Sequence, residues 1–207
     1  KGEERGGIVG YMSGGGEVNR CYVIGTVTGY REVGGIAGTG VGTIKNCYAL
    51  ADVTAAGDNA GYNAGGIAGY AYGVTIENCY YSGEVSAKNY AGGIAGYASG
   101  STIKNCVSLA NSVTGGDFVN RIAGYIFGAT LITNNHSYNR TQLVINGEIT
   151  YADGTDEKDG TNVFVSAGKL MTDVQKGEVF DWNGFDKDIW DIPTKAGKLP
   201  SLQKGTY

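Results

Sequence analysis

The sequence predicts an all-β protein: a parallel β-solenoid (β-helix) of about five rungs, followed by a small C-terminal cap. Three observations predict this fold: a motif that recurs at a nearly constant spacing, a composition rich in glycine and strand-forming residues, and the loss of the repeat near residue 143. We therefore divide the chain into a repeat region, residues 1–142, and a capping segment, residues 143–207, with one short helix.

The repeat is built on a G-G-I motif or a close variant of it. Successive copies of its apolar residue are 28, 31, 27 and 28 residues apart, and they are Ile8, Ile36, Ile67, Ile94 and Ile122. A second apolar residue, a cysteine and a valine follow in most copies, and the cysteines are Cys21, Cys47, Cys79 and Cys106. A fixed period of this length is typical of solenoids, in which one unit stacks on its own copies.

Each unit is predicted to form three short strands separated by turns. The chain has 37 glycines, 15 tyrosines and only 2 prolines, whereas helical repeats need stretches of good helix formers without glycine. Each strand would pair with the same strand of the next rung, about 4.8 Å away. Equivalent residues then form columns, and one column of asparagines can hydrogen-bond along the stack: Asn46, Asn78, Asn105 and Asn134. Arg20 interrupts that column in the first copy.

The cysteines are predicted to be free thiols in an inward-facing column. Parallel strands in register keep their Cβ atoms about as far apart as the strands themselves, beyond the ~3.8 Å that a disulfide prefers. Thiols on one column also cannot converge tetrahedrally on zinc. We therefore expect neither a disulfide nor a metal or other cofactor.

The capping segment is predicted to contain an acidic turn, a helix and an apolar cluster. Residues 151–160 do not match a calcium-binding loop, so we interpret them as a solvated turn. Ser166 is a candidate N-cap, and Gly177 a candidate stop, of one short helix. Seven apolar residues are then expected to cover the open end of the solenoid, where an unpaired rung invites association; they are Phe180, Trp182, Phe185, Trp190, Ile192, Leu199 and Leu202.

Charge and hydropathy argue against several classes of partner. The net charge of −4 is mild and spread along the chain, and without a block of lysine and arginine no nucleic acid partner is expected. No apolar run is long enough to cross a bilayer, so no transmembrane segment is expected in this fragment. The chain starts directly on a repeat and lacks the apolar region of a signal peptide. We expect one part of a larger protein whose targeting signal is not included.

Tyrosine columns supply the first group of candidate ligand-binding residues. One repeat position, interrupted by Thr39, carries Tyr11, Tyr70, Tyr97 and Tyr125. A second position carries Tyr22, Tyr48 and Tyr80. Outward columns of aromatic faces can take sugars or protein side chains, because they present a large area at low entropic cost. The alternative is that stacked tyrosines only stabilise the sheet.

A lengthened connection supplies the second group of candidates. Residues 54–64 form a longer link than their counterparts in the other copies, and insertions in solenoids become loops on one face. The candidates in this loop are Asp58, Asn59 and Tyr62. The alternative is a tolerated surface insertion, since lengthening a loop costs little.

We predict that the chain is not an enzyme. The alternative is a carbohydrate-active β-helix enzyme, a polysaccharide lyase or hydrolase, which needs carboxylates that converge on one face. Asp52 and Glu84 occupy equivalent positions on adjacent rungs, with no further acid nearby in the sequence. The single histidine, His136, replaces a repeat tyrosine and is expected to be exposed rather than part of a Ser/His/Asp arrangement. A third possibility is ice binding by a flat face of threonines. The repeat offers only one threonine per rung, which is too sparse, so this possibility ranks last.

The recurring G-G-I-A-G-Y, followed by T-I-x-N-C-Y, resembles the GLUG motif repeats of surface proteins and predicted lipoproteins of gut Bacteroidetes, which also occur as accessory repeats in IgA-specific metallopeptidases. The W-x-I and L-P-S-L of residues 190–202 are similar to a segment that often closes such arrays. The resemblance implies an adhesin-like module or spacer, secreted or at the cell surface, with a glycan or a host or cell-surface protein as its partner. It implies no protease activity, because the chain lacks an H-E-x-x-H zinc motif.

Overall fold

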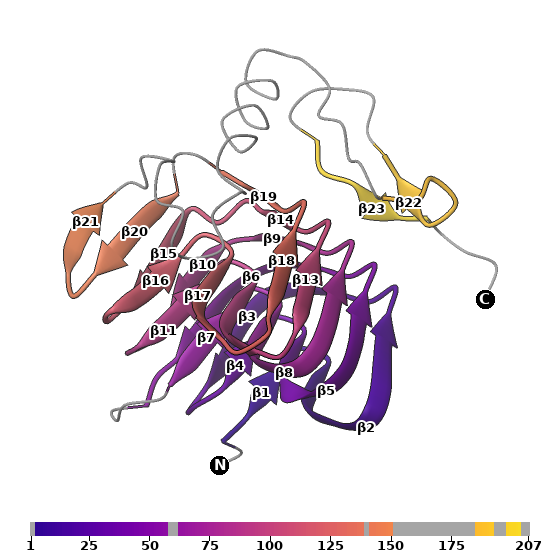
Figure 1. The fold of residues 1–207 in the computed structure, drawn as a ribbon. Helices are drawn as coiled ribbons and strands as arrows, with labels where there is room; N and C mark the ends of the chain where they lie inside the picture. Colours follow the sequence, from indigo (N-terminus) through magenta and orange to yellow (C-terminus); the bar gives the residue numbers. More distant parts are fainter. Residues whose placement is uncertain (1–2, 58–61, 139–140, 151–184, 193–197, 204–207) are drawn as a thin grey trace.

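The computed structural model shows a parallel β-solenoid (Figure 1). The chain winds through three lateral sheets, here called A, B and C, and each of the five rungs contributes strands to all three. The predicted all-β solenoid is therefore confirmed. The structure describes residues 3–57, 62–138, 141–150, 185–192 and 198–203.

The strands of each sheet follow the order of the rungs. Sheet A contains β1 (Arg5–Gly6), β4 (Val33–Gly34), β7 (Asn63–Gly65), β11 (Tyr90–Gly92) and β16 (Phe118–Asn120). Sheet B contains β2 (Val9–Asn19), β5 (Ala37–Lys45), β8 (Ala68–Glu77), β12 (Ala95–Ser99), β13 (Thr102–Lys104), β17 (Ala123–Phe127) and β18 (Leu131–Thr133). Sheet C contains β3 (Tyr22–Gly29), β6 (Tyr48–Ala55), β9 (Tyr80–Ser82), β10 (Glu84–Ser86), β14 (Val107–Ser108), β15 (Ser112–Gly115), β19 (His136–Ser137), β20 (Gln142–Ile145) and β21 (Glu148–Thr150).

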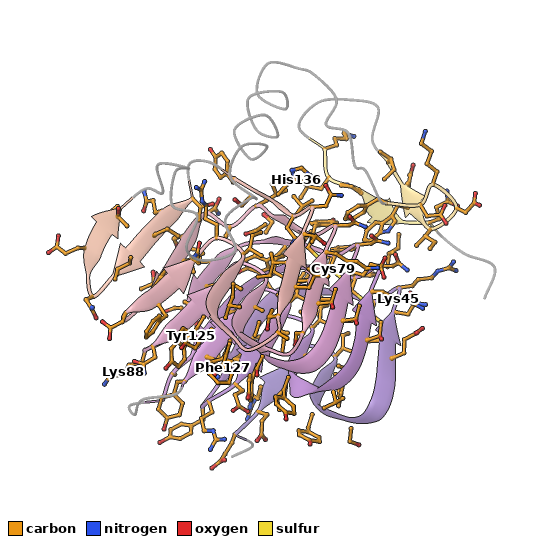
Figure 2. The ribbon with its side chains drawn as sticks, viewed as in Figure 1. Lys45, Cys79, Lys88, Tyr125, Phe127 and His136 are labelled. Atoms are coloured by element: carbon orange, nitrogen blue, oxygen red, sulfur yellow. The ribbon has the colours of Figure 1, made fainter. Side chains whose placement is uncertain are left out.

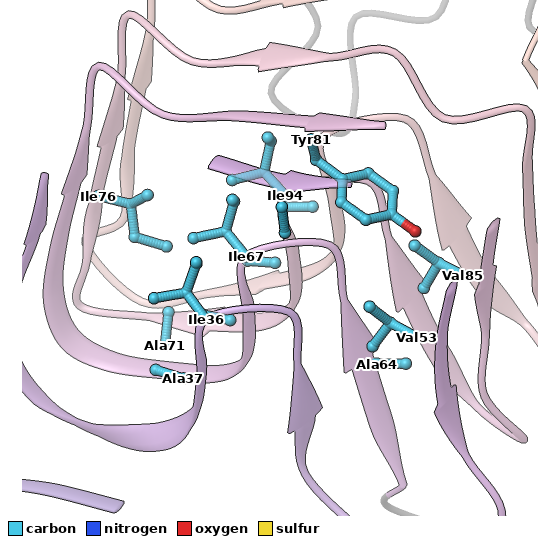
Figure 3. Close-up of a cluster of buried hydrophobic side chains, with 14 of the residues drawn as sticks. Ile36, Ala37, Val53, Ala64, Ile67, Ala71, Ile76, Tyr81, Val85 and Ile94 are labelled. Atoms are coloured by element: carbon cyan, nitrogen blue, oxygen red, sulfur yellow. The ribbon is translucent and has the colours of Figure 1, made fainter. Parts of the chain in front are cut away.

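The solenoid core consists of the apolar columns that in-register pairing creates. Ile44 pairs with Ile76 and Ile76 with Ile103, while Val85 lies between Val53 and Val113. These side chains are buried, as is the column of Ile36, Ile67 and Ile94 (Figure 3). Stacking like on like lets each branched side chain pack against an identical neighbour, so the predicted columns are confirmed.

The corner between sheets B and C is formed by asparagines in a left-handed conformation. Asn46, Asn78, Asn105 and Asn134 have φ angles of 52–53°, a region that asparagine tolerates better than most residues. Their side-chain amides form a continuous ladder: Asn78 Nδ2 donates to Asn46 Oδ1 (3.4 Å), and Asn105 Nδ2 donates to Asn78 Oδ1 (3.2 Å). Arg20 takes the corner in the first rung. The ladder still ends on an acceptor, because Asn46 Nδ2 donates to Asn19 Oδ1 (3.1 Å).

The cysteine column lies directly after this corner, and all four thiols are free, as predicted. Each buried thiol lies near the main-chain carbonyl two residues earlier, with Sγ–O distances of 3.1–3.2 Å for Cys47, Cys79 and Cys106. In the fifth rung Asn135 replaces cysteine, and its Nδ2 donates to the Ile103 carbonyl at 2.8 Å. This column therefore satisfies corner carbonyls as well as filling space.

Thiol labelling should separate the first rung from the others. Cys21 is half-buried, whereas Cys47, Cys79 and Cys106 are buried, and burial raises the pKa of the Cys79 thiol well above its usual range. Burial also raises the pKa of the Cys21 thiol, and the hydrogen bond with Cys79 lowers that of Cys47, so access of the reagent decides the order of labelling. An aromatic disulfide reagent should therefore label Cys21 in the native protein and all four thiols after unfolding. The variant Cys21→Ala should lose the native-state signal. Labelling of Cys79 as fast as Cys21 would contradict this packing.

The two ends of the solenoid differ. At the start, strands β1, β2 and β3 have a pairing partner on one side only in the described part of the chain, and Ile8 is 46 % exposed. At the other end, β20 pairs with β15 and then turns back through Asn146 and Gly147 into the antiparallel strand β21. The part of the sheet C edge that β20 forms is thus covered by a hairpin, whereas β19 pairs only with β14 in the described part of the chain, and sheet C runs on beyond residue 142.

The described part of the C-terminal segment packs on a side of the solenoid, whereas the prediction placed the apolar residues of this segment over the open end. Phe180 and Trp182 of that predicted set lie outside the described residues. The strands β22 (Trp190–Asp191) and β23 (Ser201–Leu202) form a small antiparallel hairpin. Trp190 and Phe185 form an apolar cluster with residues of sheet C that point outward, among them Tyr48 and Tyr80. The physical reason is that the outward column of sheet C carries aromatic and aliphatic side chains, and packing Trp190 and Phe185 on them removes this surface from water.

Two further predictions concern residues that the structure does not describe. The helix from Ser166 to Gly177 and the solvated turn of residues 151–160 lie outside the described residues. Where the chain is described, the structure holds no helix with the length and apolar character needed to cross a membrane.

Candidate functional site

An aromatic patch on sheets A and B is the candidate site. Tyr70, Tyr97 and Tyr125 are paired in register on β8, β12 and β17, as the repeat position predicts. Further rings from β8 and from sheet A contact them. We define the aromatic patch by its ring contacts as Tyr70, Tyr72, Tyr90, Tyr97, Phe118 and Tyr125.

Tyr90 and Phe118 join the patch because sheets A and B approach closely at their common corner. A Cβ on Gly92 would lie only 2.0 Å from the Ala95 carbonyl oxygen, so glycine is what allows the chain to turn this tightly. The ring centroids of Tyr90 and Tyr97 are consequently 5.5 Å apart, and those of Phe118 and Tyr125 are 4.7 Å apart. Neither Tyr90 nor Phe118 stands at a repeat position where tyrosine recurs, so the repeat pattern does not predict them.

The rings of the patch are tilted against one another rather than coplanar. Tyr70 and Tyr97 meet at 88°, and Tyr90 and Phe118 meet at 37°. Phe118 is 39 % exposed, and the rings of Tyr70, Tyr97 and Tyr125 are half-buried. Figure 2 shows Tyr125 on this side of the solenoid. Burial raises the pKa of the Tyr97 phenol, with a smaller contribution from Tyr125, so its hydroxyl remains a neutral donor and acceptor at physiological pH.

Tyr11 lies apart from the patch although it shares the repeat position. It pairs with Thr39, which in turn pairs with Tyr70, so one rung without an aromatic ring separates Tyr11 from the patch. Its side chain is 62 % exposed. The structure thus brings together three of the four tyrosines of this column.

The lengthened connection contributes one described candidate. Residues 54–55 still belong to β6 and residues 63–64 to β7, so the loop is shorter than the sequence indicated. Tyr62 is 4 % exposed, and its ring packs edge-on against Tyr30 at 5.2 Å. In this position its role is packing. Asp58 and Asn59 lie outside the described residues.

The second tyrosine column is stacked as predicted, but most of it does not face solvent. The rings of Tyr22 and Tyr48 are 5.0 Å apart and nearly parallel, as are those of Tyr48 and Tyr80 at 4.9 Å. The C-terminal segment covers Tyr48 and Tyr80, and the Tyr80 hydroxyl donates to the Pro200 carbonyl at 2.6 Å. Only Tyr22, in the first rung, presents its ring to water.

The residues considered for catalysis, Asp52, Glu84 and His136, take part in contacts between neighbouring rungs. Asp52 and Glu84 are exposed on adjacent rungs, and Asp52 Oδ1 accepts a hydrogen bond from the Glu84 main-chain N–H at 3.1 Å. His136 is half-buried, not exposed as predicted, and burial lowers its pKa. It pairs with Val107 of the adjacent rung, and Val107 packs against the C-terminal segment. Within the described ranges, no group of three or more His, Cys, Asp or Glu residues could hold a metal ion.

Comparison with known proteins identifies the repeat unit. No curated protein and no solved structure matches the chain. Residues 88–114 match the family model described as the GLUG motif. This segment runs from the residues before β11 to Thr114 in β15, so it covers the strands of the fourth rung. The predicted resemblance is thereby confirmed: the chain carries the GLUG motif, as one rung of a parallel β-solenoid.

Proposed function

We propose that this repeat module is a non-catalytic binding protein that acts at the cell surface or in a secreted form, and that the aromatic patch is its contact surface. The observation that carries the proposal is a contiguous group of six rings, drawn from two sheets of a rigid scaffold, with Phe118 and Tyr72 exposed. Exposed aromatic surface of this kind is typical of interaction sites. The rings of tyrosine and phenylalanine supply a large contact area at low entropic cost.

A protein is the partner that the geometry of the patch favours over a glycan. Successive sugar residues stack best on rings that share a plane, whereas neighbouring rings here are tilted by 37–88°. Tilted rings present edges as well as faces to a partner, which suits apolar and aromatic side chains, and the tyrosine hydroxyl groups can hydrogen-bond main-chain groups at the rim. An extracellular host or cell-surface protein would fit both the patch and the expected location.

Substitutions in the patch test this proposal. The double variant Tyr97→Ser and Phe118→Ser should lower binding to immobilised mucin, fibronectin or collagen by about tenfold or more, because central aromatic residues dominate interface energies. The matched control is Tyr11→Ser, which removes a more exposed tyrosine of the same column outside the patch and should leave binding unchanged. Circular dichroism would verify that all the variants keep their strands.

The outcomes distinguish the possible partners. Binding to one of the three proteins that the double variant loses and Tyr11→Ser retains would support the proposal. Equal loss in the control, or retention in the double variant, would contradict it. Signal from a glycan array alone, abolished by the same double variant, would leave the surface assignment standing and replace the protein partner with a saccharide.

A further inference from the structure

A cleft separates the beginning of sheet C from the C-terminal hairpin. Its volume is about 660 Å³, within the range of about 300–1,000 Å³ typical of small-molecule sites. It is lined by Arg20, Tyr22, Ile24 and Tyr48 of the solenoid and by Asp191, Ser201, Leu202 and Gln203 of the hairpin. None of these residues belongs to the aromatic patch.

Tyr22 provides this cleft with a flat aromatic surface. It is the first ring of the stack that continues through Tyr48 and Tyr80, with interplanar angles of 6° and 4°. Because Tyr22 belongs to the first rung, Tyr48 covers only one of its faces, and the residue is 54 % exposed, compared with 8 % for Tyr48 and 1 % for Tyr80. A ring about 5 Å beyond Tyr22 would continue the stack.

The charged groups of the cleft select for a neutral ligand. Arg20 stands on the solenoid wall and Asp191 on the hairpin wall, and both side chains are exposed. In the described part of the chain neither residue takes part in a salt bridge. An anionic ligand would be attracted by Arg20 and repelled by Asp191, and a cationic ligand the reverse. A neutral molecule with several hydroxyl groups can accept from the guanidinium and donate to the carboxylate.

The remaining polar groups of the hairpin wall fit the same kind of ligand. Gln203 is held in place because its Nε2 donates to the Lys187 carbonyl at 2.5 Å and its main-chain N–H donates to the Ile189 carbonyl at 2.9 Å. This arrangement leaves the Gln203 side-chain oxygen as an acceptor for hydroxyl groups, next to Ser201. Ile24 and Leu202 add apolar contact on the two walls.

We propose that this cleft binds a neutral saccharide, with one sugar ring stacked on the free face of Tyr22 and its hydroxyl groups hydrogen-bonded to Arg20 and Asp191. The proposal is independent of the aromatic patch, which lies on other sheets and favours a different class of partner. It assigns a binding role to the one exposed member of the second tyrosine column and to the hairpin that covers the rest.

Methyl NMR of the whole chain tests the site directly. Tetramers of β-linked glucose, xylose and mannose would be titrated into protein labelled at isoleucine and leucine methyl groups. At least one tetramer should shift the signals of Ile24 and Leu202 and leave that of Ile149, exposed on β21, unchanged. Tyr22→Ala should weaken this binding by about tenfold or more, since it removes the stacking surface. Tyr22→Phe, which keeps the ring, should retain most of the affinity.

Further variants separate this inference from the proposed function. Tyr97→Ser should leave saccharide binding intact, and Asp191→Asn should weaken it. The inference would be overturned if no tetramer shifted Ile24 and Leu202, if Tyr22→Ala bound as well as the wild type, or if Tyr97→Ser abolished the binding. Tighter binding of a tetramer of galacturonic acid or of glucosamine than of every neutral tetramer would overturn the selection for a neutral ligand. None of these results depends on whether the patch binds a protein.

Discussion

Gly65→Ala should destabilise the solenoid by about 3 kcal/mol or more, an unusually large effect for one added methyl group. A Cβ at this position would lie 2.0 Å from the Ala68 carbonyl oxygen and 2.6 Å from the Gly96 main-chain nitrogen. Both atoms belong to the backbone, so the clash cannot be relieved by rotating a side chain. Two neighbouring rungs would have to separate at the corner of sheets A and B. Urea unfolding followed by circular dichroism would measure the loss.

Gly16→Ala is the matched control for this prediction. Its Cβ would lie 3.6 Å from the nearest atom, the Ser13 carbonyl oxygen, which is an ordinary contact. The free energy of unfolding should change by no more than about 0.5 kcal/mol. Equal stability of the two variants would mean that the corner is looser than the structure shows. The aromatic patch would then lose the close approach that brings Tyr90 to Tyr97.

The solenoid could be predicted from the sequence because, when rungs stack in register, the spacing of the repeat determines which residues become neighbours in the fold. Each rung must repeat the residue type of the rung before it, so the period seen at Ile36, Ile67 and Ile94 translates directly into a column in the core. The asparagine ladder and the column of free thiols follow from the same repetition. The prediction does not depend on recognising any long-range contact, since the neighbour of each strand lies one period away.

The aromatic patch could be predicted only in part, because Tyr90 and Phe118 do not recur at one position of every repeat. Tyr90 pairs with Asn63, and Phe118 follows Tyr90, so these two rings belong to no tyrosine column. They reach Tyr97 and Tyr125 across a corner, and the distance across a corner is set by backbone geometry rather than by spacing in the sequence. The close-packed glycines were a usable signal: a corner without side chains brings outward residues on its two sides together.

The end of the repeat carries a second signal, which lies in a turn dipeptide and not in the spacing of the copies. Asn146 and Gly147 form the dipeptide most typical of a two-residue hairpin turn, and both have positive φ angles, 50° and 87°. They connect β20 to the antiparallel strand β21. The lateral docking of the C-terminal segment had no comparable signal, because the Tyr80 hydroxyl and the Pro200 carbonyl are 120 residues apart in the sequence.

Trp190→Ala should release the C-terminal segment from the solenoid at a cost of about 3–5 kcal/mol. Trp190 is fully buried, and its ring centroid lies 6.1 Å from that of Tyr48, 5.8 Å from that of Tyr80 and 4.9 Å from that of Phe185. The rungs pair among themselves, so the variant should keep the strands of the solenoid while residues 185–192 and 198–203 become sensitive to protease. Leu199→Ala, in the same segment but with a partly exposed side chain, should remain resistant.

Alkaline unfolding supplies an independent readout of the same contact. Burial, with a smaller contribution from Tyr48, raises the pKa of the Tyr80 phenol far above its ordinary value. Above about pH 10 the unfolded chain loses the Tyr80 proton while the folded chain keeps it, so stability falls by up to about 1.4 kcal/mol per pH unit for this group; below that pH the group contributes no pH dependence. In Trp190→Ala the exposed phenol ionises nearer its ordinary value, and the fall becomes shallower. Tyr81 and Cys79, whose pKa values burial also raises, keep their share in both proteins. Identical slopes in the two proteins would show that Trp190 does not shield Tyr80, and the cleft beside Tyr22 would then lose the hairpin that forms its second wall.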